Sequence, residues 1–272
     1  MRKQNVSARI VFAGLAFLLC GCSGASRAAP GADTDTIARH DSVAELVAAS
    51  TRVADSHQSV SMDLDLGREG SGSCVYHAES PSVYAYRCEF DSTENGKPGR
   101  TVLVLTPSVT YVEIPVGQRH SDRKSWLTIR AGEDPALFQH EFGTEQIRDL
   151  AVPDKMIPTS GATIVHVAPD NMDGKSATRY TIDIDTAAAA RNAMTGEQRS
   201  QMKYLADQGI STVEVNYWVD AQDLPVKIEA VTSIPKIGPL GSTVRYRDWG
   251  SPVRIDVPSD DQVSTVLELG GR

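Results

Sequence analysis

The chain has 272 residues, with 27 lysines and arginines against 35 aspartates and glutamates. This acidic balance argues against a nucleic-acid partner, because nucleic acids are bound through basic surfaces. The length is enough to bury the core of one large β-rich domain or of two small ones.

The N-terminus has the composition of an export signal. Arg2, Lys3 and Arg9 flank a start without acidic residues, and an apolar run follows from Ile10 to Leu19. We expect residues 1–21 to be a signal peptide. The run is shorter than the ~20 apolar residues of a membrane-spanning helix. Removing three basic residues leaves 24 basic against 35 acidic ones, a net charge of −11, so membrane contact should come from an anchor and not from a basic face.

The stretch Leu19-Cys20-Gly21-Cys22 resembles the bacterial lipobox. By that resemblance Cys22 receives a diacylglycerol, and the protein is held at the extracytoplasmic face of the plasma membrane. The alternative is cleavage by ordinary signal peptidase after Ala28 or Ala29, which would release the protein.

Two segments follow the signal peptide. Residues 22–40 are small and polar, which predicts a disordered tether, and residues 41–272 form the folded domain. The domain opens with a helix from Asp41 to about His57, because Ser42 and Glu45 stand three apart like a capping box before an apolar helical pattern.

The pattern then changes to period two, which predicts strands. A second helix is expected over 134–150 and a third, in two pieces closed by Gly209, over 186–207. The predicted strands are near 59–66, 72–79, 82–90, 101–106, 109–114, 124–130, 162–168, 177–184, 212–219, 226–232, 242–249 and 253–257. Short turns favour an antiparallel meander, and the helices must lie across one of its faces.

Cys74 and Cys88 are the cysteines left for a disulfide, since Cys20 is removed and Cys22 is lipidated. Pro81 lies midway between them, so a hairpin centred on it pairs the two cysteines directly. The same register pairs Tyr76 with Tyr86 and Ala78 with Tyr84. A free thiol or a metal ligand is the alternative, with no histidine or cysteine at zinc-like spacing nearby.

Several short motifs together resemble the actinobacterial LppX/LprG-type lipoprotein family. They run over residues 41–258 and comprise the first helix leading into 59–66, then Tyr111-Val112-Glu113-Ile114-Pro115, Ser125-Trp126-Leu127, Tyr217-Trp218-Val219-Asp220, Leu224-Pro225-Val226, Thr243-Val244-Arg245-Tyr246, Asp248-Trp249-Gly250-Ser251-Pro252-Val253 and Pro258. The resemblance implies an α+β fold, a single LolA-like antiparallel half β-barrel with helices covering its concave face. It also implies an apolar cavity that takes up a lipid or acylated glycolipid. Cys74 and Cys88 depart from the family pattern.

Recognisable catalytic chemistry is missing from the sequence. The six histidines show no H-x-x-x-H or H-E-x-x-H spacing, and no G-x-S-x-G or Walker-type motif occurs. Asp63 and Asp65 alternate with apolar residues, which is typical of a solvated strand face. We therefore expect neither an enzyme nor a bound metal or cofactor, although an unrecognised site stays an alternative.

The candidate ligand cavity is placed at the third helix. Ala190, Met194, Met202 and Leu205 supply small and soft side chains that adapt to varied ligands. They are interpreted as a lid, and a thin core face is the alternative. Five aromatic residues could form a platform that binds a carbohydrate. The alternative is that they pack in the core or as cross-strand pairs. They are Tyr76, Tyr84, Tyr86, Phe90 and Trp126.

Two functions follow from these patterns. The first is a membrane-anchored envelope lipoprotein that binds or carries a lipid in an apolar cavity. The second is an envelope scaffold or sensor that binds a protein partner and has no lipid cargo.

Overall fold

The computed structural model describes residues 40–67, 70–80, 82–94, 97–119, 121, 123–130, 147, 149–192, 196–234 and 238–264. These residues form two compact units. Of the described residues, the first unit contains those within 54–156 and 243–264, and the second contains those within 40–53 and 157–242. Cys22, the signal peptide and the tether lie outside the described residues.

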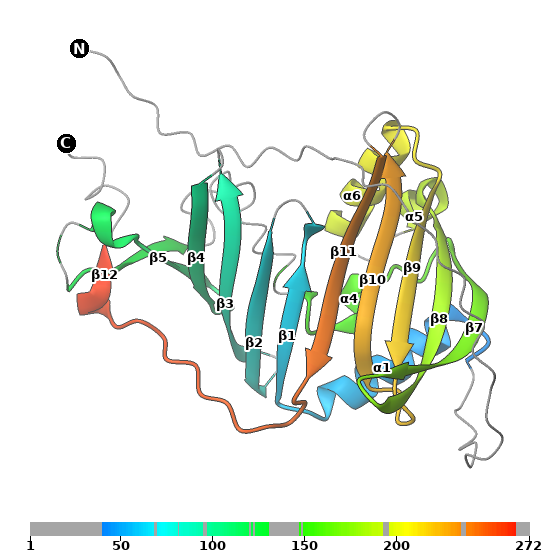
Figure 1. Cartoon of the computed structure of the whole chain (residues 1–272), viewed down its shortest axis with the longest axis horizontal. Coiled ribbons are helices and arrows are strands. Elements are labelled where there is room, and N and C mark those ends of the chain that lie inside the picture. Colours follow the sequence, from blue (N-terminus) through cyan, green and yellow to red (C-terminus); the bar gives the residue numbers. More distant parts are fainter. Residues whose placement is uncertain are drawn as a thin grey trace. The chain divides into compact units, whose positions relative to one another are not determined.

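The first unit is built on a sheet in which β1 to β6 lie side by side in chain order (Figure 1). Neighbouring strands are antiparallel in the order β6-β5-β4-β3-β2-β1-β11, and β12 adds to β6 in parallel. Its elements are β1 (Ser59–Asp65), β2 (Ser71–Ser80), β3 (Val83–Glu94), β4 (Lys97–Leu105), β5 (Val109–Glu113), η2 (Val116–Gln118), β6 (Trp126–Arg130), α4 (Pro153–Met156), η3 (Asp260–Gln262) and β12 (Val263–Ser264). The sheet is therefore mixed, which corrects the expected wholly antiparallel one.

The second unit is an antiparallel meander in the order β10-β9-β8-β7, with helices inserted between β8 and β9. Strand β11 belongs to both units, because its first five residues fall in the second and the rest in the first. The elements are α1 (Val43–Asp55), β7 (Ala162–Met172), β8 (Lys175–Asp185), α5 (Thr186–Asn192), α6 (Gly196–Asp207), β9 (Thr212–Val219), β10 (Pro225–Ile234) and β11 (Gly238–Arg247). Two residues of α1, Ala54 and Asp55, are counted with the first unit.

Most sequence predictions of local structure are confirmed. The first helix, the divided third helix and eleven of the twelve predicted strands match the observed elements to within a few residues. The predicted strand at 253–257 is wrong: this stretch is irregular and exposes Arg254, Asp256 and Val257. Pro252 and Pro258 flank it, and proline cannot donate to a strand ladder. The predicted helix at 134–150 falls mostly outside the described residues.

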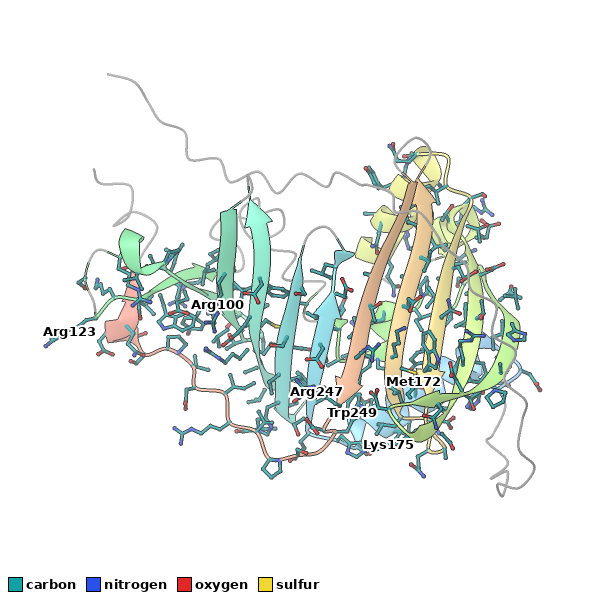
Figure 2. All side chains as sticks on the ribbon, viewed as in Figure 1. Arg100, Arg123, Met172, Lys175, Arg247 and Trp249 are labelled. Carbon is teal, nitrogen blue, oxygen red and sulfur yellow. A yellow bond between two sulfur atoms is a disulfide. The ribbon has the colours of Figure 1, made fainter. Side chains whose placement is uncertain are left out.

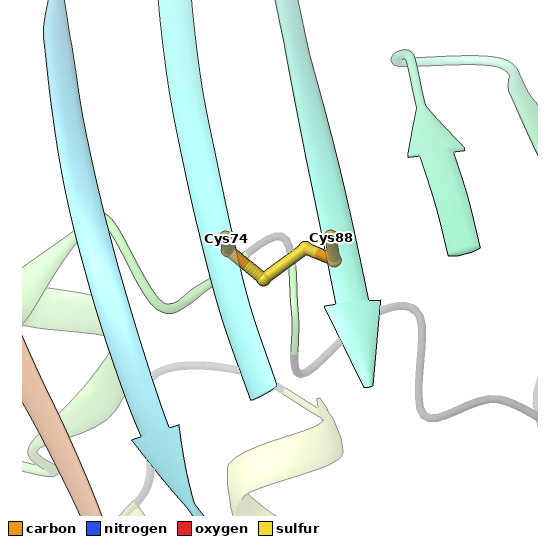
Figure 3. The surroundings of a disulfide bond; sticks show 2 residues. All are labelled: Cys74 and Cys88. Carbon is orange, nitrogen blue, oxygen red and sulfur yellow. A yellow bond between two sulfur atoms is a disulfide. The ribbon is translucent and has the colours of Figure 1, made fainter. Parts of the chain in front are cut away.

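The core of the first unit is built from cross-strand rows. One row joins Met62, Cys74, Cys88 and Leu103 across four strands, and each of these side chains is at most 1% exposed. The disulfide in this row is confirmed, with a Cα–Cα distance of 4.1 Å (Figure 3). The predicted register is confirmed too, since Tyr76 pairs with Tyr86 and Ala78 with Tyr84.

The opposite face of these strands carries charge. Asp63 accepts two hydrogen bonds of 2.9 Å from Arg247, which lies near the end of β11 (Figure 2). The hydrogen bond from Arg247 lowers the pKa of Asp63, although partial burial opposes it. Asp63 is thus a structural carboxylate on a solvated strand face, as its alternation with apolar residues indicates.

The two faces of the second unit's sheet also differ. One face stacks Tyr180 on Tyr217 and Ile182 on Val215, all at most 5% exposed. The other face carries Trp218, whose indole donates to Asp170 over 2.8 Å and lies 4.4 Å from the Lys227 ammonium. The cation–π contact and the hydrogen bond stabilise this buried aromatic side chain on a face that is otherwise polar.

Among the described residues, no helix has the length and apolar character needed to cross a membrane.

Candidate amphiphile-binding site

The candidate site is built on α5 and α6, which form a helical hairpin between β8 and β9. The helix α5 begins where the Asp185 carboxylate accepts a hydrogen bond of 2.8 Å from the Ala188 amide, a typical N-cap. The Thr186 hydroxyl donates to the Ile210 carbonyl over 2.6 Å and joins the start of α5 to the chain that follows α6. Gly209, at φ +79°, ends α6 in the left-handed region that glycine favours.

The helix α6 buries little of its own surface. Of its described side chains only Gln198 and Met202 are buried, at 6% and 7% exposure, and Leu205 is half-buried. Tyr204 is 61% exposed. A helix is stabilised in a protein mainly by its buried apolar face, so this one is weakly held.

The structure places the predicted cavity residues on these two helices. Ala190 is half-buried on α5, while Met202 and Leu205 lie one turn apart on α6. The two helices contact each other. Met194 lies outside the described residues.

Three hydroxyl groups are buried where α1 packs on the second unit's sheet. They belong to Ser50, Thr178 and Tyr217, which are at most 3% exposed and have no well-formed hydrogen bond among the described residues. Burial raises the pKa of Tyr217, and the nearby Ser50 hydroxyl offsets only part of this. A buried hydroxyl without a partner costs ~1–3 kcal/mol, a cost that a polar ligand group or a water would remove.

A second group of polar residues lies on the first unit's core face. Tyr76, Tyr84 and Tyr86 form a ring cluster whose centroids are 4.7 to 6.2 Å apart. Tyr86 is only 1% exposed, and burial raises its pKa well above the ordinary value. The cluster is therefore a set of cross-strand core pairs, which favours the structural interpretation over a carbohydrate platform.

The chain around α4 is fixed to that face through tyrosine hydroxyls. The Ala151 amide hydrogen-bonds Tyr86, and the Tyr246 hydroxyl donates to the Leu150 carbonyl over 2.8 Å. Loss of solvation and the neighbouring Asp154 carboxylate raise the pKa of Asp55, at the end of α1. The two hydrogen bonds tie the chain that leads into α4 to the sheet.

A pocket of about 310 Å³ lies on the solvated face of the first unit. Ser71, Gly72, Ser73, Glu89, Asp91 and Arg100 line it. Partial burial raises the pKa of Glu89, but hydrogen bonds from Arg100 and Arg87 outweigh this and hold it below its ordinary value. The polar lining and the internal ion pairs make this pocket unsuited to an acyl chain.

One histidine has a specific partner that sequence reasoning missed. The His40 ring lies 2.8 Å from the Asp223 carboxylate, and the His40 amide donates to the Tyr180 hydroxyl over 3.3 Å. The two residues are 183 positions apart, so no local pattern could have indicated the pair. The described residues contain no group of three or more histidines, cysteines and acids that could hold a metal.

Comparisons with known proteins give limited sequence similarity. No family model matches the chain. A 106-residue stretch is 33% identical to an uncharacterized 31.2 kDa protein encoded in the rplA-rplJ intergenic region of Streptomyces griseus. That stretch covers 38% of this chain and only 34% of the Streptomyces protein.

Solved structures that are similar to the chain include LprF from Mycobacterium bovis. The TM-score is 0.48 at 14% identity, over 79% of this chain and 96% of LprF. A second is MucB in complex with MucA(peri), with a TM-score of 0.35, 11% identity, and coverage of 81% of this chain and 58% of MucB. A third is the MucA/MucB complex of Pseudomonas aeruginosa, with a TM-score of 0.34, 12% identity, and coverage of 82% of this chain and 61% of the other.

Proposed function

We propose that the protein is a lipid-anchored cell-envelope lipoprotein that binds an amphiphile beneath the α5–α6 hairpin. The observation that carries this proposal is the sparse burial of α6, in a hairpin that extends from strand ends lined by aliphatic residues. Ile182, Ile184 and Val213 are almost fully buried at the end of β8 and β9 from which the hairpin extends. A weakly held helix beside such a surface can separate from it at low cost.

Acyl-chain burial would provide the driving force. Each CH₂ removed from water contributes ~0.8 kcal/mol of favourable binding free energy. Burial of a chain of ten carbons therefore offsets the loss of the few contacts made by Met202 and Leu205. The proposal includes the expectation from the sequence that the sheet is curved into a half β-barrel.

The anchor is the second part of the proposal. Cys22 in Leu19-Cys20-Gly21-Cys22 would carry the diacylglycerol. Cys22→Ala should abolish incorporation of labelled fatty acid and leave a precursor of altered mass. Equal labelling of the variant and the wild type would contradict the anchor.

The cavity is tested by a bulky substitution with a matched control. Ala190→Trp adds volume at a half-buried position of α5, and Arg191→Trp adds the same side chain at an exposed neighbouring position. We expect uptake of a fluorescent fatty acid to fall at least tenfold in Ala190→Trp and to change little in Arg191→Trp, with similar melting temperatures. Equal uptake by both variants would place the pocket elsewhere.

Native mass spectrometry of the protein from its own host separates lipid binding from the alternative function. A bound species of several hundred daltons that organic solvent extracts supports the carrier. A ligand-free protein that co-purifies with a stoichiometric protein partner supports the scaffold or sensor predicted as the alternative.

A further inference from the structure

We infer that the polar pocket on the solvated face of the first unit binds a neutral sugar, through hydrogen bonds with Ser71, Ser73, Asp91 and Arg100. The pocket belongs to the first unit, whereas α5 and α6 belong to the second. The inference therefore goes beyond the proposed lipid site and does not depend on it.

The side chains that line the pocket share one face of three neighbouring strands. Ser71 on β2 is paired with Asp91 on β3, and Asp91 is paired with Arg100 on β4 (Figure 2). In the next row Ser73 is paired with Glu89. Directly opposed residues lie on the same face of a sheet, and so do residues two apart along a strand. The five side chains therefore form one continuous array of polar groups.

The pocket is open because β2 carries small residues at this point. Ser71, Gly72 and Ser73 extend little above the strand, while β3 carries the longer side chain of Glu89. Gly72 has no room for a larger side chain, since a Cβ there would lie 2.6 Å from the Phe90 ring and 2.7 Å from the Glu89 carbonyl oxygen. The volume of about 310 Å³ is that of a small-molecule site.

The base of the pocket is held in place by the disulfide. Cys74 and Cys88 are the next pair after Ser73 and Glu89, and their side chains lie on the buried face of the same two strands (Figure 3). The bond therefore fixes β2 to β3 directly behind the pocket. A site that is fixed before its ligand arrives loses less conformational entropy on binding.

Hydrogen-bond donors and acceptors alternate in the array. The Asp91 carboxylate is an acceptor without a hydrogen bond or ion pair among the described residues. The Arg100 guanidinium is a donor that pairs with Glu89 but leaves the side chain 62% exposed. The hydroxyls of Ser71 and Ser73 can donate and accept. Neighbouring hydroxyls of a sugar ring match this array, because one can donate to a carboxylate while the next accepts from a guanidinium, and such charge-assisted hydrogen bonds are strong.

The charges around the pocket cancel, which favours a neutral ligand. Glu89 and Asp91 contribute two negative charges, and Arg87 and Arg100 contribute two positive ones. The neighbouring strands β1 and β11 add two aspartates and two arginines to the same face, namely Asp63, Asp65, Arg245 and Arg247. An anion would approach Asp91 and a cation would approach Arg100, so each would meet a like charge. A neutral sugar meets neither penalty.

The test is saturation-transfer NMR on the full-length lipidated protein, with maltose and lactose as the sugars. The protein is kept in a zwitterionic detergent, because a sugar-based detergent would compete. Asp91→Ala removes the carboxylate acceptor, and Ser73→Leu fills the pocket. Glu79→Ala is the matched control, since Glu79 is an exposed carboxylate at the other end of β2 and does not line the pocket. Inorganic phosphate, followed by phosphorus NMR, is the charged comparison.

We expect saturable transfer to at least one of the two sugars, with a Kd that Asp91→Ala raises about tenfold and Glu79→Ala leaves unchanged. Ser73→Leu should abolish the transfer. Uptake of the fluorescent fatty acid should be the same in all three variants, so failure of the sugar site is distinguished from failure of the lipid site. The inference would be overturned by the absence of saturable transfer to both sugars, or by equal sugar affinities of Asp91→Ala and Glu79→Ala. Binding of phosphate in place of sugar would overturn it as well, because Arg100 would then select an anion.

Discussion

The β2–β3 hairpin of the first unit and the α5–α6 hairpin of the second are stabilised by different contacts. The first is cross-linked by Cys74–Cys88 and packed through Tyr86, in a row of residues that are nearly inaccessible. The second is held through Thr186, Ala189 and Met202, while Tyr204 stands in solvent. The comparison teaches that one chain can contain a densely packed hairpin and a sparsely packed one, and that burial distinguishes them.

The largest expected effect comes from removing the disulfide. Closing a loop of ~15 residues stabilises a fold by ~3 kcal/mol in the chain-entropy model. Replacing both cysteines with alanine should therefore lower the melting temperature without abolishing the fold, as measured by calorimetry. Hydrogen exchange should accelerate in β2 and β3 and remain unchanged in α6. An unchanged melting temperature would show that the hairpin is already fixed without the bond.

Two tyrosines provide a smaller and sharper test. Tyr246→Phe removes the hydrogen bond to the Leu150 carbonyl and should cost ~1 kcal/mol of unfolding free energy. Tyr217→Phe removes a buried hydroxyl without a well-formed partner and should be neutral or slightly stabilising. Urea unfolding of both variants measures the difference. If Tyr217→Phe were the more destabilising of the two, the Tyr217 hydroxyl would have a partner in solution.

Period-two alternation was a reliable guide to the strands, because each strand has one buried face. The register of β2 and β3 followed from the symmetry of Cys74 and Cys88 about Pro81 and needed no tertiary information. The irregular stretch at 253–257 alternates equally well, with Val253, Ile255 and Val257. It has no partner strand, which only the tertiary structure reveals.

The candidate site was less accessible to sequence reasoning. The soft composition of Ala190, Met202 and Leu205 indicated helices with little apolar surface, and the structure shows how little of α6 is buried. The pairing of His40 with Asp223 joins residues far apart in the chain. A solvated carboxylate in a polar turn and a histidine before a helix are each unremarkable in sequence, so their contact could not be predicted.

Asp55 should respond to pH in the opposite sense from most carboxylates. Its pKa is raised by loss of solvation and by Asp154, and a negative charge at the end of α1 opposes the helix dipole. The folded state therefore holds its proton more tightly than the unfolded state, and stability falls as pH rises through the raised pKa. Asp55→Asn should be more stable than the wild type by a few tenths of a kcal/mol at pH 7, with no gain near pH 3.

Substitution of Asp63 has the smallest expected effect on stability, and its pH dependence has the opposite sign to that of Asp55. Its pKa is lowered by Arg247, so the unfolded state binds the proton more readily and the ion pair stabilises the fold above the unfolded pKa near 4. The two side chains are about half exposed, which limits the contribution to a few tenths of a kcal/mol. Asp63→Asn should therefore be slightly less stable than the wild type at pH 7, and the difference should vanish as pH falls through the lowered pKa. Melting temperatures measured from pH 7 to pH 2 at low and high salt check this, since screening by salt should shrink the difference at pH 7. A difference that persisted at pH 2 would mean that Asp63 acts through packing and not through its charge.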